Sequence, residues 1–547
     1  MAYKLEIASI NDLKALANKL FAAADRERMQ WLGLFNTAYT YVLPNKNQFY
    51  EESVKTKGTQ KDLYVYDSTA IIGVKHFVSK VQQLLFPSQS TWLTQELQEK
   101  EPDPAKAENE TEEQFDFDDI NKRLSKRNKQ VFHYINNSNF ELAMHESLHE
   151  LAIGTGVIQV RPGDRHKPLE YISIPINEVY INAWRNGFTQ AIWRKSDTMT
   201  ISEIEALWPK ADLTQIRFNT QDPSLEVLSV IEGEICVEIK PTLAGVKKRY
   251  IYLVMIQSEI VFQEERSYSP WVVFRWRKLP NESYGRGAVL DCLSAILTVN
   301  QICKYELSAA ALAISPPFMG FGDGIFNPFN FNLQPNTFIS VAPTQSGSWP
   351  IAQLPVSNNL NFAQLQIQDY RAQINNALFV QPLGQIDAPP KTATEVAYRQ
   401  RQLAEQIGGS FPRLLSECAY PIFEKSIEVL EHKGLIEKLI IPSDKLETHY
   451  VSPIARAENL DKIQSFTNFL QIMHATVGPE KATLSLDMLK LPYWLGENSN
   501  LDKELLKNRA QLEAELQNMA QMQATELQGL QDAQQAAAQP SLPQGSI

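Results

Sequence analysis

The 547-residue chain lacks several features, and each shortage excludes a class of protein. It has no run of 18 apolar residues, which a transmembrane helix needs, and its longest apolar stretch, YIYLVMI at 250–256, has the length of a strand. No apolar segment typical of a signal peptide follows MAYKLEIASIND at 1–12. We therefore expect a protein that neither enters a membrane nor is exported by a signal peptide.

Cysteine is also scarce. The four cysteines are far apart in apolar surroundings, without C-x-x-C spacing: Cys236, Cys292, Cys303 and Cys418. This spacing predicts reduced thiols, as in cytosolic proteins, and argues against both a disulfide framework and a zinc ribbon.

The chain also lacks a nucleotide-binding loop and an excess of positive charge. No G-x-x-x-x-G-K-[ST] motif occurs, so the chain has no phosphate-binding loop of its own. Its 52 Lys and Arg against 63 Asp and Glu give a net charge of −11 at pH 7. Proteins that wrap nucleic acid by neutralising phosphates are normally basic. The composition therefore argues against general wrapping of DNA, but it is compatible with DNA sliding past.

One motif that is present points to an enzyme. The stretch HESLH at 145–149 matches H-E-x-x-H, in which two histidines one helical turn apart bind zinc. A zinc peptidase also needs a third ligand and an open position for water. Ala152 and Thr155 replace the glycine and histidine of the longer metzincin motif, and the nearest other histidine, His166, lies in a predicted loop.

A structural helix explains the same stretch without a metal. Ser138 and Glu141 have the spacing of a capping box, and Gly154 provides a stop. Between them, apolar residues recur at helical spacing: Phe140, Met144, Leu148 and Leu151. We interpret 138–153 as a structural helix and expect no catalytic residue, no metal and no cofactor. A zinc metalloprotease is the alternative.

The rest of the pattern predicts a mixed α+β, helix-rich chain whose length divides it into three or four packed units. Apolar residues at helical spacing predict helices over 11–41 and 67–87. Between 154 and 279 alternating segments separated by Gly, Pro and Asn predict an antiparallel β region.

Helical patterns return in the second half of the chain. Residues 286–313 predict a helix of roughly 42 Å if it is continuous. Helices are also predicted over 359–379 and over 392–434, the latter kinked near Gly408, Gly409 and Pro412 and ended by Gly434. Short helices are expected over 453–498, and the Gln- and Ala-rich 499–547 resembles a helix that needs copies of itself to bury a thin apolar seam.

Six stretches, in this order, together resemble the portal (head-to-tail connector) protein of short-tailed bacteriophages. They are YDSTAIIGVKHFVSKVQQLLFP, NSNFELAMHESLHELAIGTGVIQV, ESYGRGAVLDCLSAILTVNQ, SPPFM, KTATEVAYRQRQLAE and YVSPIARAE. The likeness covers nearly the whole chain. It implies a portal-type subunit with wing, stem, clip and crown that assembles into a closed dodecameric ring around a central channel.

The resemblance also implies where these parts lie. The wing would be 1–285 (with the antiparallel β region 154–279), the stem helices 286–313 and 361–378, the clip 314–360, the tunnel loop 379–391, the long kinked helix supporting wing and crown 392–434, the crown 435–498, and the C-terminal helix and tail 499–547.

The function implied is a channel at the capsid vertex through which double-stranded DNA is packaged and ejected without sequence specificity, and to which the tail attaches. The implied partners are the terminase large subunit, tail adaptor and nozzle proteins, and the major capsid, scaffold and internal core proteins. The protein would assemble in the host cytoplasm and reside at the portal vertex of the virion. A virion structural protein without a channel is a further alternative.

A DNA channel should repel its cargo more than it holds it. In a dodecamer the chain charge becomes 12 × −11 = −132, and screening over roughly 8 Å keeps the repulsion short-ranged. We expect a mostly acidic and amide-lined channel with basic rings at Lys391 and, less surely, Arg399 and Arg401, and with uncharged contacts from Gln381 and Gln385. For the two arginines, pairing with acidic residues of their own helix is an equal alternative.

Two further groups are expected at protein contacts. Tyr284 and Arg286, in YGRG, are predicted subunit-interface residues because the two glycines allow close backbone approach; an ordinary helix-start arginine is the alternative. The aromatic residues of the clip are predicted to bind neighbouring clips and a tail adaptor. They are Phe318, Phe321, Phe326, Phe329 and Phe331.

Overall fold

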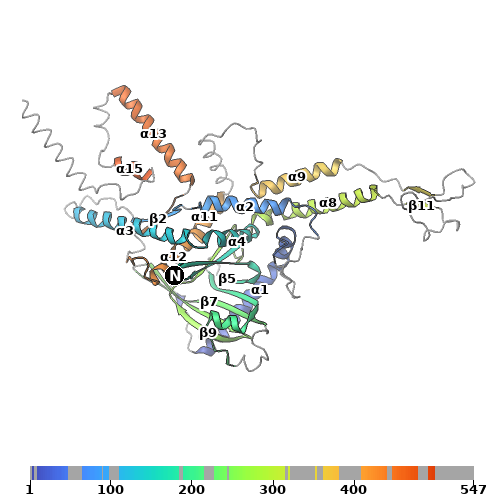
Figure 1. Cartoon of the computed structure of the whole chain (residues 1–547), viewed down its shortest axis with the longest axis horizontal. Coiled ribbons are helices and arrows are strands. Elements are labelled where there is room, and N and C mark those ends of the chain that lie inside the picture. The colour runs from blue at the N-terminus through green and yellow to red at the C-terminus, as the bar shows by residue number, and fades with distance from the viewer. Residues whose placement is uncertain are drawn as a thin grey trace, which may run out of the picture.

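The computed structural model describes residues 3–4, 9–46, 64–88, 90–97, 110–183, 189–214, 227–242, 245–314, 318–320, 351–353, 361–380, 408–439, 446–451, 453–477 and 491–498. These residues form a mixed α+β structure, as the sequence predicts (Figure 1). None of their helices is both long and apolar enough to cross a membrane.

The described residues up to Ile153 are mainly helical. Their helices are α1 (Ile10–Val42), α2 (Thr69–Leu85), α3 (Glu110–Asn136) and α4 (Phe140–Ile153). The sequence predicts α1, α2 and α4. It does not predict α3, whose first half is a charged stretch with few apolar residues to show helical spacing.

The predicted capping box of α4 is wrong. The N-cap is Asn139, and Ser138 Oγ accepts a hydrogen bond from the Phe140 N–H at 3.1 Å. The Asn139 side chain pairs with the backbone of Tyr171, to whose carbonyl it donates (2.7 Å) and from whose N–H it accepts (2.9 Å). This tertiary contact fixes the start of α4, whereas Gly154 ends the helix as predicted.

The predicted antiparallel region consists of two sheets. The smaller sheet has the order β10-β3-β4, built from β10 (Trp271–Arg275), β3 (Thr155–Pro162) and β4 (Leu169–Ile174). The larger has the order β5-β6-β7-β8-β9, with β1 (Tyr3–Lys4) pairing with β7; its strands are β5 (Val179–Ala183), β6 (Thr189–Thr200), β7 (Val227–Thr242), β8 (Gly245–Ile256) and β9 (Glu259–Arg266). All these pairings are antiparallel, which confirms the prediction. The short helices of this region are η1 (Ile176–Glu178) and α5 (Ile201–Leu207).

The helix predicted over 286–313 is not continuous. It is divided into α7 (Ala288–Asp291) and α8 (Leu293–Ile314) by Cys292, whose backbone leaves the helical region at φ −107° and ψ 11°. The Gly287 N–H bonds to the Ile153 carbonyl at 2.7 Å and so ties the start of α7 to the end of α4. With 22 residues, α8 is about 33 Å long.

The remaining elements follow α8 in the chain. They are β11 (Phe318–Gly320), β12 (Ile351–Gln353), α9 (Asn361–Ala377), η3 (Gly408–Ser410), α11 (Phe411–Leu414), the π-helical turn η4 (Leu415–Ala419), α12 (Tyr420–His432), β13 (Leu446–Tyr450), α13 (Pro453–Val477) and α15 (Leu491–Asn498). Near the predicted kink the geometry changes from 3₁₀ to α to π, whereas residues 392–407 of the predicted long helix lie outside the described residues. Gly434, at φ +69°, follows the end of α12 as predicted. However, α13 is not one of the short helices expected. β13 pairs with β2 (Leu93–Leu97), a strand from the first quarter of the chain.

The main hydrophobic core is one cluster that joins helices to the smaller sheet. It joins the C-terminal half of α1, α2, α4, the smaller sheet, α7, the inner half of α8, the end of α9 and α12. The N-terminal half of α1 packs on the larger sheet in a second cluster. All four cysteines are free and buried, which confirms that none of them forms a disulfide.

Candidate site for subunit assembly and the DNA channel

The predicted interface residues lie in a segment, 283–287, that crosses the end of α4. A Cβ placed on Gly285 would lie 2.4 Å from the Gly154 carbonyl oxygen, and one on Gly287 would lie 2.2 Å from the Ala152 carbonyl oxygen. Because both obstacles are backbone atoms, only glycine fits at these positions. The two glycines thus allow a close backbone approach inside the subunit, and the predicted contact between subunits stays a prediction.

Tyr284 is buried within this crossing. Its side chain has no exposed surface, its hydroxyl donates to the Val179 carbonyl at 3.2 Å, and its ring contacts Trp31 and Phe35. Burial raises the pKa of Tyr284 above its usual value. The structure therefore places this predicted interface residue in the core of its own subunit, where it has no surface to offer a second chain.

Arg286 faces outward from the same crossing. Its guanidinium donates to both carboxylate oxygens of Glu282 at 2.8 and 3.2 Å and lies 5.0 Å from the centre of the Trp31 ring. Its side chain is 42% exposed. Arg286 is thus held in one orientation at the surface, and its role in a subunit contact stays a prediction.

α8 and α9 form an adjacent pair that is fastened to the body at one end. Figure 1 shows them projecting side by side from the body, with β11 beyond their far ends. Asn300 of α8 accepts hydrogen bonds from the backbone of Tyr66 and Asp67. Arg371 of α9 donates two hydrogen bonds, of 2.8 and 2.5 Å, to the buried Asp67 carboxylate. A single segment, the approach to α2, therefore fastens both helices.

The far part of this pair has apolar side chains that nothing in the described part of the subunit covers. Residues of α8 from Leu293 to Cys303 contribute to the core, whereas no residue from Lys304 to Ile314 is buried. Five large apolar side chains of the pair are about half exposed or more: Tyr305, Leu307, Leu312, Ile314 and Leu365. We call these five the exposed apolar set.

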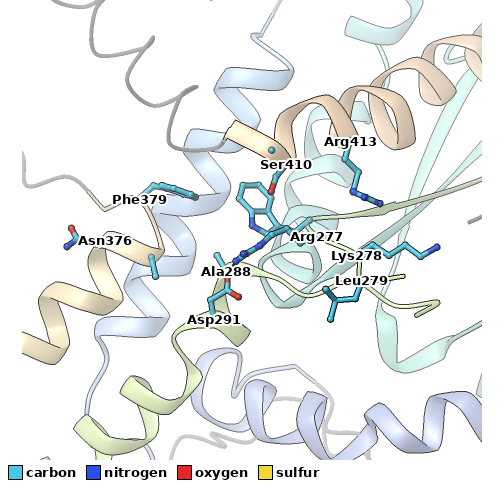
Figure 2. Close-up of a pocket in the computed structure, with 12 residues that line it drawn as sticks. Arg277, Lys278, Leu279, Ala288, Asp291, Asn376, Phe379, Ser410 and Arg413 are labelled. Carbon is cyan, nitrogen blue, oxygen red and sulfur yellow. Dashed lines mark ion pairs between the residues drawn. The ribbon is translucent and has the colours of Figure 1, made fainter. Parts of the chain in front are cut away.

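A basic pocket of about 510 Å³ lies where α9 ends and α11 begins (Figure 2). Three cations line it: Arg277 and Lys278 after β10, and Arg413 of α11. Asp291 of α7 pairs with Arg277, and Arg413 pairs with Glu417 at 3.1 Å. The pocket thus carries more positive than negative side chains.

Lys278 is the cation of this pocket without a close carboxylate partner. No ion pair or side-chain hydrogen bond joins Lys278 to another described residue. Burial lowers the pKa of Lys278, and the positive charges of Arg275 and Arg413 lower it further. The sequence reasoning missed these cations, although RWRK at 275–278, directly after a predicted strand, was a signal for them.

The pocket fixes both described ends of the segment 381–407. Phe379, two residues after the end of α9, has a positive φ of 55° and packs between Phe77 and Trp276, with centroid distances of 6.0 Å to each. Its carbonyl accepts a hydrogen bond from Lys80. Gly409 lines the same pocket from the other end of the segment. The two ends are therefore held next to the same cluster of cations.

Comparison with known protein families identifies the family of this chain. A family described as "Bacteriophage head to tail connecting protein" matches residues 14–506. The chain belongs to this family. The portal protein of Escherichia phage T7 is 21% identical over 405 residues, which are 72% of this chain and 71% of the T7 protein. The function is accordingly that of a phage portal protein, the connector between head and tail.

Most of the predicted contact residues of this connector lie outside the described residues. This applies to the channel candidates Lys391, Arg399, Arg401, Gln381 and Gln385, and to Phe321, Phe326, Phe329 and Phe331 of the predicted clip. Phe318 lies in β11, at the position opposite Gln353 of β12. This strand pair connects two ends of the predicted clip.

The H-E-x-x-H stretch of the connector lies on α4, against α2. Among the described residues, no group of three or more His, Cys, Asp or Glu side chains could hold a metal ion. Glu146, the general base of the peptidase motif, is exposed. The described residues thus do not supply the third ligand that a zinc peptidase requires.

Proposed function

We propose that twelve copies of this connector close into a ring around a central channel, through which double-stranded DNA is packaged and ejected. In this proposal the wing, stem, clip, tunnel loop and crown have the boundaries expected from the sequence. The α8–α9 pair is the stem, and the β11–β12 pair belongs to the clip.

The exposed apolar set carries this proposal. Burying one large apolar side chain contributes about 1.5–3 kcal/mol, so five such side chains that no described residue of the subunit covers strongly favour association. Their placement on one projecting helix pair favours contact with the same pair of a neighbouring copy. Repetition of one such contact by rotation produces a closed ring.

The net charge of −11 supports a channel that does not grip DNA. Duplex DNA carries one negative charge per roughly 1.7 Å of its axis, so a channel with few cations leaves it free to slide. The proposed basic rings are Lys391, Arg399 and Arg401, with uncharged contacts from Gln381 and Gln385. These residues belong to the segment whose ends are held at the basic pocket.

The proposed partners follow from the connector's place between head and tail. The terminase large subunit docks at the clip during packaging, and the tail adaptor and nozzle proteins replace it there, covering the phenylalanines at 318–331. The major capsid, scaffold and internal core proteins surround the wing and crown. We place the assembled ring at the portal vertex of the virion, after assembly in the host cytoplasm.

Averaged electron micrographs of the purified chain test the proposal. We expect a closed ring with a central hole in end-on views and a mass close to twelve subunits by light scattering. A compact monomer, or an oligomer without a hole, would contradict the proposal, and the second result would favour a virion structural protein without a channel. Metal-dependent peptide cleavage by the same preparation would favour the protease alternative.

A further inference from the structure

The proposed channel does not use the two histidines of α4, yet their arrangement is specific. The rings of His145 and His149 lie one helical turn apart, with centroids separated by 5.0 Å and planes at 75°. Two imidazoles that share a tetrahedral zinc ion at about 2.0–2.1 Å have ring centres roughly 5 Å apart. The ring separation is therefore compatible with a shared metal ion.

Hydrogen bonds decide which nitrogen of each ring carries the proton. His149 Nδ1 lies 2.9 Å from the carbonyl oxygen of His145, which can only accept, so this nitrogen donates. His145 Nδ1 lies 2.8 Å from Oε1 of Gln82, and the Gln82 amide nitrogen donates to the Glu141 carbonyl at 3.0 Å. The oxygen of Gln82 therefore faces His145, whose Nδ1 also donates. In both neutral rings, Nε2 is left with its lone pair.

Both Nε2 atoms are free to bind. Neither has a hydrogen-bond partner among the described residues, and neither is sealed from solvent. Donation from Nδ1 to a fixed oxygen is how proteins hold metal-binding histidines in one tautomer and orientation. Burial lowers the pKa of His149, and the charge of Lys46 contributes to this, so the ring stays neutral at pH 7. Neutral imidazole is the form that binds metal.

The charges around the pair allow a cation to approach. Lys46, the nearest cation, is itself paired with the buried Glu150 carboxylate at 2.5 Å. Glu141 and Glu146 are exposed acids on the same helix. Imidazole nitrogens favour zinc, nickel and copper, whereas magnesium and calcium prefer oxygen ligands.

We propose that His145 and His149 bind one Zn²⁺, Ni²⁺ or Cu²⁺ ion through their Nε2 atoms, with the other coordination positions open to water or to a donor from another molecule. The proposal is for binding alone, because a catalytic zinc site uses three protein ligands and the described residues provide two here. It is independent of the channel.

Calorimetric titration of the metal-free full-length chain with Zn²⁺, and then with Ni²⁺, tests this site. We expect saturable binding of about one ion per chain, unaffected by millimolar Mg²⁺ and weaker in acid, because protons compete with the metal ion for its ligands. His145→Gln and His149→Gln should each remove the saturable binding. Gln82→Ala, which removes only the partner of His145 Nδ1, should weaken it about 10-fold or more.

His166→Gln provides the matched control, because His166 is an exposed histidine in the loop between β3 and β4 and belongs to neither turn of the proposed site. It should bind metal like the unchanged chain. Electron micrographs of all variants should show the same assembly, which separates this proposal from that of the ring. Unchanged binding in the His145→Gln/His149→Gln double variant, or no saturable binding by the original chain, would overturn the proposal.

Discussion

The body of the subunit and the far part of the α8–α9 pair differ in how much of their apolar side-chain surface is buried. In the body, large side chains such as Trp92, Tyr171 and Phe274 are almost completely buried. On the projecting pair, Leu307 and Ile314 are 58% and 86% exposed. One surface therefore serves the folding of the subunit and another is available for assembly. Changes in the first should unfold the subunit, and changes in the second should leave it folded but unassembled.

The largest effect is expected where backbones cross in the body. In Gly285→Val the new Cβ would lie 2.4 Å from the Gly154 carbonyl oxygen and 3.0 Å from the Arg277 carbonyl oxygen. Because backbone atoms cannot move aside without shifting α4 or β10, we expect a loss of at least about 3 kcal/mol in the free energy of unfolding. Denaturant unfolding, or loss of soluble protein, measures this change.

Gly33→Ala is the control for that substitution. A Cβ at Gly33, in the middle of α1, would meet no atom within 4 Å. Alanine favours the helix over glycine by up to about 1 kcal/mol, so this variant should be slightly more stable. If Gly285→Val proved as stable as the original chain, the crossing would not have the importance assigned to it.

A smaller effect is expected at the joint between body and projecting pair. Asp67→Asn removes the charge that Arg371 contacts and should lower the free energy of unfolding by about 1–3 kcal/mol at pH 7. Burial alone would raise the pKa of Asp67, but hydrogen bonds from Thr69 and Arg371 outweigh it, so the pKa is lowered. The stabilisation is therefore present above about pH 3.9, the unfolded value, and is lost as the pH falls through the lower folded pKa.

Denaturant unfolding and hydrogen exchange in α9 measure the effect of Asp67→Asn. The difference from the original chain should begin to shrink below about pH 4 and should vanish only below the lowered folded pKa of Asp67, where both proteins carry an uncharged side chain. Arg371→Lys, which keeps the charge but loses the second hydrogen bond, should give a smaller loss. Equal exchange protection of α9 in all three proteins would contradict a fastening role.

Local patterns predict several helices of this molecule, because a helix with one buried face has apolar residues at helical spacing. The predicted limits of α1, α2 and α9 agree closely with the structure. Other features depend on partners far away in the chain. Asn139 displaces the expected cap because it pairs with Tyr171, and β2 exists because β13, some 350 residues later, pairs with it.

The candidate site likewise has some features that the sequence predicts and others that it does not. The two glycines of YGRG correctly predict a close backbone approach, but they do not reveal that its partner is Gly154 of the same chain. The basic pocket brings Arg413 next to Arg277 and Asp291, which lie more than 100 residues earlier in the chain. The packing of α7, α9 and α11 brings these residues together, and no spacing in the sequence predicts it.

A pH-dependent effect of moderate size is expected inside the body. Burial raises the pKa of Glu234, on β7, to about 7, although Ser269 and Lys425 act against this. The folded state therefore holds a proton that the unfolded state releases near pH 4.3, and stability falls as the pH rises from there to about 7. Glu234→Gln should abolish this fall, so its stability relative to the original chain should rise by on the order of 3 kcal/mol between the ends of that window.

Denaturant unfolding at several pH values between 4 and 8 measures the effect of Glu234→Gln. Glu259→Gln is the control, because Glu259 is exposed and its pair with Lys14 lies at the surface. Its effect should stay within about 1 kcal/mol at every pH. A parallel pH dependence for Glu234→Gln and the original chain would show that this carboxyl is not the group responsible.

The smallest effect on the subunit should accompany the clearest effect on assembly. Leu307→Gln and Ile314→Gln change side chains that make little contact in the subunit, so each should alter its stability by no more than about 0.5 kcal/mol. Together they remove two members of the exposed apolar set, and the ring should dissociate at concentrations where the original chain stays assembled. Sedimentation velocity and end-on micrographs measure this. Leu142→Gln, on α4 and 72% exposed, is the matched control. If it disrupted assembly equally, or if the double variant formed complete rings, the projecting pair would not be the surface that holds the copies together.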